Sequence, residues 1–169
     1  ADVNDDQYVD IGVYVDDTVD FTSMSFYKQN QNGTFTLLTT LPFNGTSFYE
    51  YTDINVFTDK ETYVYKVKLT DICGFPSIES DTVKTILLTG KSFINYTNQL
   101  EWSPYYGFVG GIDSYEINRA TGPDFSFQVS GNSAFDELLY VDDVFNLGQT
   151  GAKFQYTVSA VQGNNIYGF

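Results

Sequence analysis

The stretch Tyr65-Lys66-Val67-Lys68-Leu69 places an apolar side chain at every second position, and Tyr156-Thr157-Val158-Ser159-Ala160 repeats this pattern 91 positions later. Alternation with a period of two is typical of a β-strand that buries one face and exposes the other. A helix would instead space its apolar residues three or four positions apart. The two stretches therefore predict strands, and their match predicts an internal duplication.

The same alternation recurs along the chain, and turn signals separate the alternating runs. These signals are Asn32-Gly33, Asn44-Gly45, Gly110-Gly111 and Gly122-Pro123-Asp124. Aromatic residues make up 18% of the chain, and aromatic side chains suit half-buried pleated surfaces. Because no stretch has a convincing helical pattern, we predict an all-β fold of the β-sandwich type.

Further segments repeat at nearly the same spacing as the first pair. Val9-x-Ile11 aligns with Leu100-x-Trp102, and Tyr51-Thr52-Asp53 aligns with Tyr140-Val141-Asp142 at a spacing of 89. A nearly constant offset over several strands indicates a tandem array of whole domains, because each repeat is large enough to form a sandwich.

The duplication predicts two domains, residues 1–89 and 90–169, with a boundary near Gly90. Residues 80–88 are expected to form the last strand of the first domain. The equivalent segment would lie beyond Phe169, so we expect the second domain to lack its closing strand in this chain. We also expect the natural protein to continue past this residue.

Charge and composition argue against several classes of function. The formal net charge is −14, which opposes binding to nucleic acid and to anionic membranes. With no His, a serine-type triad and histidine-ligated zinc are unavailable, and one Cys cannot form an internal disulfide. No apolar run approaches the roughly 20 residues of a membrane span. We expect no enzyme, cofactor or bound metal, and no nucleic acid partner or membrane insertion.

Three segments resemble strands B, C and F of a fibronectin type III domain: Leu100-Glu101-Trp102, Tyr115-Glu116-Ile117-Asn118-Arg119 and residues 154–160. The resemblance implies two tandem fibronectin type III-like sandwiches, which are immunoglobulin-like in architecture. It places Trp102 in the core, as does its alternation with Leu100. It also places the strand-F tyrosine of the family, whose hydroxyl bonds to the backbone, at Tyr63, whereas the equivalent Phe154 lacks a hydroxyl.

A narrower resemblance covers nearly all of the chain. Residues 69–74, 82–88, 100–105 and 163–169 are similar to segments of gliding-motility-associated surface proteins of the Bacteroidota that carry a type B sorting domain. In that family, such paired domains precede a C-terminal sorting domain for the type IX secretion system. The resemblance implies a non-catalytic stalk in a large exported cell-surface adhesin. The partners it implies are the outer-membrane type IX export or gliding machinery.

Tyr105, Tyr106 and Phe108 follow Trp102 and are a candidate aromatic contact patch, for which a glycan is the candidate ligand. The preferred interpretation is that these aromatics cover the end of the sandwich, although exposed apolar clusters do mark interfaces. An exposed patch would favour the alternative function, a carbohydrate-binding accessory module of a secreted polysaccharide-degrading enzyme.

Thr18 and Thr82 are candidate O-glycosylation sites. Asp17-Thr18-Val19 and Asp81-Thr82-Val83 resemble the Asp-Ser/Thr-aliphatic pattern used on exported proteins of the Bacteroidota.

Cys73 is the single cysteine, and its pairing state is left open. We expect its side chain to fill space beside the turn at Gly74.

Pairs of aspartates occur at Asp5-Asp6, Asp16-Asp17 and Asp142-Asp143. Paired carboxylates can act as acid and base or hold Ca²⁺. Asp2-x-Asn4-x-Asp6 resembles half of a calcium loop, but Gln7 stands where Gly should turn the chain. We therefore interpret the pairs as solvated turn residues. The Asn-x-Thr patterns at Asn32, Asn44 and Asn95 predict turns and strand starts.

Overall fold

The computed structural model describes residues 2–3, 7–16, 19–122, 126–147 and 152–164. This part of the chain contains strands and turns and no helix, so it has no helix that could cross a membrane. The all-β prediction is confirmed. The chain divides into two units, Ala1–Thr85 and Ile86–Phe169.

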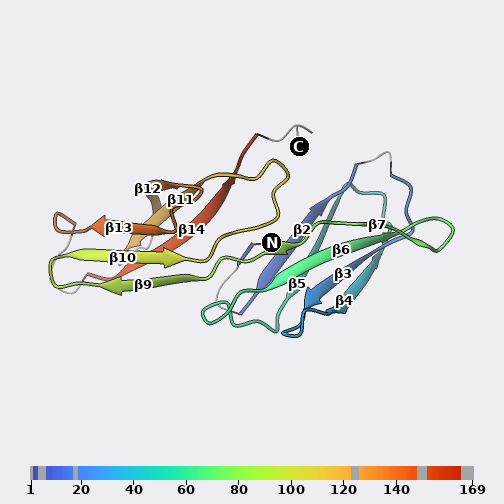
Figure 1. The fold of residues 1–169 in the computed structure, drawn as a ribbon, viewed down its shortest axis with the longest axis horizontal. Helices are drawn as coiled ribbons and strands as arrows, with labels where there is room; N and C mark the ends of the chain where they lie inside the picture. Colours follow the sequence, from blue (N-terminus) through green and yellow to red (C-terminus); the bar gives the residue numbers. More distant parts are fainter. Residues whose placement is uncertain (1, 4–6, 17–18, 123–125, 148–151, 165–169) are drawn as a thin grey trace. The chain divides into compact units, whose positions relative to one another are not determined.

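Unit 1 contains two antiparallel sheets (Figure 1). The first has the order β1-β2-β5, formed by β1 (Asp2–Val3), β2 (Val9–Tyr14) and β5 (Phe48–Asp53). The second has the order β4-β3-β6-β7, formed by β4 (Phe35–Pro42), β3 (Ser23–Gln29), β6 (Val64–Thr70) and β7 (Pro76–Glu79). The short strand β8 (Val83–Lys84) also pairs with β6.

Unit 2 repeats this plan with six described strands (Figure 1). One sheet has the order β13-β10-β9, formed by β13 (Leu139–Asp143), β10 (Thr97–Trp102) and β9 (Leu88–Ser92). The other has the order β12-β11-β14, formed by β12 (Phe127–Ala134), β11 (Ile112–Thr121) and β14 (Phe154–Gln162). In the described residues of unit 2, nothing corresponds to β7 and β8.

The units divide between Thr85 and Ile86, a few residues before the predicted boundary at Gly90. Gly90 lies within β9 and pairs with Leu100 of β10. Ile86 and Leu88 pack against the core of unit 2. These contacts assign residues 86–89 to the second unit, because burial and strand pairing hold them there.

Each unit has one hydrophobic core, and the alternating residues of both sheets contribute to it. In unit 1 the largest buried side chains include Tyr65, Phe26 and Met24. In unit 2 they include Tyr115 and Ile117. Two sheets that share a buried face in this way form a β-sandwich.

Trp102 is buried, and the prediction that it belongs to the core is confirmed. Its ring lies edge-to-face against Tyr115, with centroids 5.5 Å apart. Its Nε1 is buried and has no hydrogen-bond partner among the residues that the structure describes. Since Trp102 is the single tryptophan of the chain, its fluorescence reports on unit 2 alone.

We predict that Ile117→Ala lowers the free energy of unfolding of unit 2 by about 2–5 kcal/mol, because a fully buried side chain is replaced by a cavity. Trp102 fluorescence in a urea titration measures this change. The control is Val129→Ala, an exposed position that should change stability by less than about 0.5 kcal/mol. Equal effects of the two variants would contradict the assigned core.

Candidate functional site

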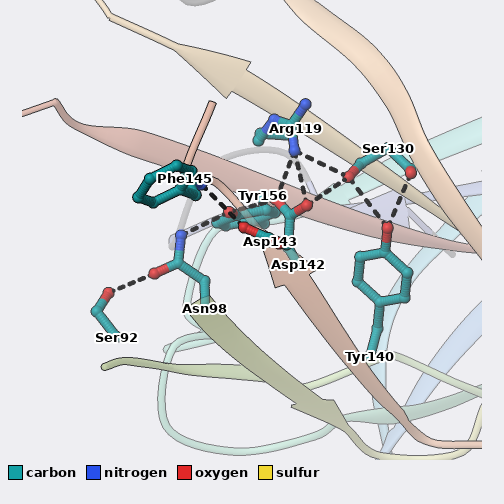
Figure 2. A network of polar contacts seen from close by, with 9 residues as sticks. All are labelled: Ser92, Asn98, Arg119, Ser130, Tyr140, Asp142, Asp143, Phe145 and Tyr156. Carbon is teal, nitrogen blue, oxygen red and sulfur yellow. Dashed lines mark hydrogen bonds and ion pairs between the residues drawn. The ribbon is translucent and has the colours of Figure 1, made fainter. Parts of the chain in front are cut away.

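A charged and polar cluster lies inside unit 2 (Figure 2). Asp142 of β13 is only 4% exposed. Nη1 of Arg119, on β11 in the opposite sheet, donates to both carboxylate oxygens of Asp142 at 2.7 Å. The hydroxyl of Tyr156, on β14, donates to Oδ2 of Asp142 at 2.7 Å. Side chains from both sheets therefore meet on one buried carboxylate.

A β-bulge brings a further donor to Asp142. The pairing of β11 with β12 shifts between Ile117 and Asn118, and Ser130 is the extra residue on β12. A bulge re-aims side chains, and here the Ser130 hydroxyl donates to Oδ1 of Asp142 at 3.2 Å. The hydroxyl of Tyr140 donates to the Ser130 carbonyl at 2.8 Å (Figure 2).

The close approach of Tyr140 to β12 explains Gly131. A Cβ at this position would lie 2.6 Å from the Tyr140 ring, which is shorter than van der Waals contact. A larger residue would push this ring away from the bulge and disturb its hydrogen bond to Ser130.

Asn98 and Ser92 extend the network toward the edge of the sandwich (Figure 2). Nδ2 of Asn98 donates to the Tyr156 hydroxyl at 2.7 Å, and the Ser92 hydroxyl donates to Oδ1 of Asn98 at 2.7 Å. Burial and the neighbouring Asp142 carboxylate raise the pKa of Tyr156 above its ordinary value. The phenol therefore stays protonated and keeps donating to Asp142.

Unit 1 contains the same arrangement at equivalent positions. Asp53 of β5 is 2% exposed, and Nζ of Lys28 on β3 lies 2.8 Å from its Oδ2. The hydroxyl of Tyr65 on β6 donates to the same oxygen at 3.0 Å. Burial and the Asp53 carboxylate raise the pKa of Tyr65 above its ordinary value. We call each set of three side chains the Asp–cation–Tyr cluster.

Asp53 and Asp142 occupy equivalent positions of the repeat, as do Tyr65 and Tyr156, but the pattern of the repeat did not predict the clusters. The prediction that Asp142 is a solvated turn residue is wrong, because the side chains of Tyr140 and Asp142 face inward in alternation with exposed Val141. Asp143 fits the prediction, since its Oδ1 accepts the backbone N–H of Phe145 at 3.0 Å. The sequence did contain a signal for the cluster, because alternation along the strand places the Asp142 carboxylate on the same inward face as Tyr140.

The contacts of the two clusters indicate a structural role. Both oxygens of Asp142 accept hydrogen bonds from side chains of the same unit, so this carboxylate has no open side for a substrate. No group of three or more metal-ligating side chains occurs in the part of the chain that the structure describes. What each cluster does is connect two sheets through a buried charge.

The three aromatics of the candidate contact patch do not form one exposed surface. Tyr105 is buried, its backbone N–H donates to the Tyr115 hydroxyl at 3.0 Å, and its ring lies 4.7 Å from that of Phe108. Phe108 is half-buried against the core of unit 2. Only Tyr106 is largely exposed, because the other two rings cover the end of the sandwich.

The remaining predicted positions lie apart from the clusters. Thr82 is exposed just before β8, whereas Thr18 and the central part of the half calcium loop at residues 4–6 lie outside the described residues. Cys73 is exposed and unpaired, so the expectation that it fills space beside Gly74 is wrong. Asn32 and Asn44 accept backbone N–H groups two residues later, which confirms the predicted turns.

Tyr63 makes the hydrogen bond that its position predicted. Its hydroxyl accepts the backbone N–H of Phe57 at 2.9 Å and donates to Oε1 of Glu61 at 2.8 Å. This bond fixes the segment that leads into β6.

An exposed apolar cluster at one end of unit 2 was not predicted. Its members are Phe93, Ile94, Tyr96, Phe145 and Leu147. Tyr96 has a φ of 62°, a left-handed conformation that is unusual for a bulky residue. Its ring lies edge-to-face on Phe145, with centroids 5.3 Å apart. The sequence signal for this exposed cluster is the pair Phe93-Ile94, two large apolar residues between strands.

No family model matches the chain, and no curated protein matches it. The chain is similar to a solved two-domain fibronectin type III segment of chicken tenascin, with 10% sequence identity and a TM-score of 0.37. The match covers 97% of this chain and 90% of the tenascin segment.

We predict that Asp142→Asn lowers the free energy of unfolding of unit 2 by about 3 kcal/mol, because the half-buried Arg119 loses its counter-charge. Trp102 fluorescence in a urea titration measures the change. The matched control is the neighbouring Asp143→Asn, which should change stability by less than about 0.5 kcal/mol, since Asn can also cap this turn. Equal transitions for the two variants would argue against a structural role of the cluster.

We expect Tyr63→Phe to destabilise unit 1 by about 0.5–1.5 kcal/mol, because the hydroxyl loses its hydrogen bonds to the Phe57 N–H and to the exposed Glu61 carboxylate. Far-UV circular dichroism during urea unfolding measures this effect. The Trp102 fluorescence transition should not move, because the substitution lies in unit 1. If the Tyr63→Phe variant has the same circular dichroism transition as the wild type, the Tyr63 hydroxyl contributes nothing to the stability of unit 1.

Proposed function

We propose that this chain is a non-catalytic spacer segment near the C-terminus of a large exported cell-surface adhesin. The observation that carries the proposal is the duplicated Asp–cation–Tyr cluster. Asp53 and Asp142 are the buried carboxylates of the described residues, and each connects the two sheets of its own unit. Each cluster joins the two sheets of its unit through a paired charge, and a fixed pairing of sheets suits a protein that holds other parts at a distance.

The acidic composition supports this role. A net charge of −14 keeps a surface segment soluble and opposes self-association through charge repulsion. Repeated sandwiches are also a common way to build an extended chain of domains, because each one folds around its own core.

The cellular context of the proposal comes from sequence resemblance. The segments at 69–74, 100–105 and 163–169 resemble those of gliding-motility-associated proteins with a type B sorting domain. We propose that the parent protein reaches the outer surface through the type IX secretion system. The outer-membrane export or gliding machinery is then the proposed partner. Thr18 and Thr82 remain proposed O-glycosylation sites of the exported form.

Carbohydrate binding is the second candidate function, and the exposed cluster at the end of unit 2 favours it. Tyr96 and Phe145 are both more than half exposed, and aromatic side chains of this kind mark contact surfaces. Their rings are inclined at 78°, so they do not form a flat platform. This geometry favours the spacer function over carbohydrate binding.

Calorimetric titration with oligosaccharides separates the two candidates. A spacer should show no binding at millimolar concentrations of polysaccharide fragments, for the wild type and for Tyr96→Ala alike. Binding that the wild type shows and Tyr96→Ala loses would instead support the carbohydrate-binding module.

Localisation tests the proposed context directly. Antibodies raised against the chain should label intact cells of the source organism, and deletion of the type IX export machinery should abolish this labelling. Antibodies against an unrelated outer-membrane protein provide the control. Labelling that is independent of the export machinery would contradict the proposal.

Force spectroscopy of the chain tests the proposal that it is a spacer of two independently folded sandwiches. We predict two separate unfolding events, each releasing up to about 300 Å, because each unit has some 85 residues at up to about 3.6 Å per residue. A single event that releases the whole chain at once would contradict two independent sandwiches.

A further inference from the structure

Two exposed turns of unit 1 place Asn directly before Gly. Asn32-Gly33 lies between β3 and β4, Asn44-Gly45 lies between β4 and β5, and Thr follows both pairs. The two glycines have similar φ angles of 83° and 79°. Because Gly has no Cβ, its backbone nitrogen is open to approach by the preceding Asn side chain. The two pairs therefore offer the same local chemistry in two folded settings.

The amide oxygens of the two Asn side chains make equivalent hydrogen bonds. Oδ1 of Asn32 accepts the backbone N–H of Thr34 at 3.0 Å, and Oδ1 of Asn44 accepts that of Thr46 at 3.1 Å. The hydroxyls of these threonines lie 2.6 and 2.7 Å from the same oxygens. Such donors stabilise the negative charge that develops on Oδ1 when a nucleophile attacks Cγ. Both amides are therefore prepared for attack to a similar degree.

The two turns differ in the backbone N–H of the glycine. The N–H of Gly33 donates to the carbonyl of Asn30 at 2.9 Å. The N–H of Gly45 has no hydrogen-bond partner among the described residues, and it lies in an exposed loop. This nitrogen can attack Cγ only after its proton leaves, and a carbonyl that accepts the N–H opposes this loss. The nitrogen of Gly45 is therefore the more available nucleophile.

Further hydrogen bonds hold the first turn rigid. The N–H of Asn30 donates to the carbonyl of Thr34 at 2.7 Å. Nδ2 of Asn30 also donates to the hydroxyls of Thr34 and Thr36, at 3.1 and 2.8 Å. These bonds close the hairpin around Asn32-Gly33. A rotation that brings the glycine nitrogen toward Cγ of the Asn must strain them.

The second turn is held at its ends instead. The N–H of Phe43 donates to the carbonyl of Thr22 at 2.8 Å, and the carbonyl of Ser47 accepts the N–H of Val15 at 2.9 Å. Residues 44–46 bridge these two fixed points. Their peptide groups make no backbone–backbone hydrogen bond within the part of the chain that the structure describes, so they rotate at a smaller cost than those of the hairpin.

We propose that Asn44 is a self-modification site, at which the chain converts an amide to a carboxylate without an enzyme. The Gly45 nitrogen gives its proton to solvent base and forms a bond to Cγ of Asn44. The Cγ–Nδ2 bond breaks, and Nδ2 leaves as ammonia with a proton from water, so a cyclic imide remains. Water then adds to either imide carbonyl and opens the ring. The net reaction consumes one water, releases one ammonia and yields aspartate or isoaspartate at position 44.

The product changes unit 1 and leaves unit 2 as it is. Either product adds a negative charge to the loop that connects the two sheets of unit 1, in a chain whose formal net charge is already −14. Isoaspartate also inserts its Cβ into the main chain, between the points fixed at Phe43 and Ser47. This inference is independent of the proposed spacer function.

Peptide mapping of the complete chain by mass spectrometry tests the site. Folded protein is incubated in mildly alkaline buffer, and the products at Asn32 and Asn44 are followed over time. Asn44 should react about three- to tenfold faster, because at Asn32 the hydrogen bond of the following N–H must break first. An isoaspartyl methyltransferase identifies isoaspartate at position 44. This product indicates the imide, because direct hydrolysis of the amide gives aspartate alone.

Two controls connect the difference in rate to the fold. In guanidinium chloride the unfolded chain should react at about the same rate at both positions, since both are Asn-Gly-Thr in sequence. Asn44→Ser removes the reactive amide and keeps a residue that suits this turn. This variant should yield no product in the β4–β5 loop, while Asn32 reacts as in the wild type. Far-UV circular dichroism checks that it is folded.

The proposal is wrong under any of three results. The first is a rate at Asn44 that does not exceed the rate at Asn32 in the folded protein. The second is the same excess at Asn44 in the unfolded chain, which would assign the difference to the neighbouring sequence. The third is aspartate without isoaspartate at position 44, which would exclude the attack by the Gly45 nitrogen.

Discussion

A carboxylate that leaves water must find a counter-charge and hydrogen-bond donors, or the structure that buries it loses several kcal/mol. Asp53 and Asp142 impose this constraint on the two units. In unit 2 the partners of Asp142 come from β11, β12 and β14, while Asp142 itself belongs to the other sheet. The two sheets can therefore close in only one arrangement that satisfies the charge.

The same constraint fixes strand register. A slip of β13 by one residue along β10 would turn Asp142 to the solvent face and bring Val141 inward. Arg119 would then remain beside the core without its partner. The hydrophobic pattern already disfavours this slip, and the buried charge adds a second, independent penalty. Lys28 and Asp53 act in the same way in unit 1.

The units differ in how they complete their sheets. In unit 1, β7 and β8 cover β6, and the inward side chains of β6 are buried. In unit 2, the equivalent side chains of β14 are only half-buried and a cavity lies beside them. The duplicated sequence pattern therefore gives the same strands in both units, whereas the degree of burial depends on what lies along the edge.

Local sequence patterns were enough to predict the strands, the duplication and the core position of Trp102. Period-two alternation is a local property of the chain, and one face of each strand must avoid water wherever that strand lies. The hydrogen bond of Tyr63 was also expected, because its position resembles that of the strand-F tyrosine of fibronectin type III domains.

The roles of Asp142 and Tyr105 depend on contacts that exist only in the folded chain. The partners of Asp142 lie 12 to 23 positions away along the chain, on three other strands, so no local pattern could show that its charge is buried and paired. Tyr105 is buried in the core of unit 2, where its backbone N–H donates to the hydroxyl of Tyr115 on β11. Burial and pairing are relations between distant segments, and a pattern of neighbours along the chain does not record them.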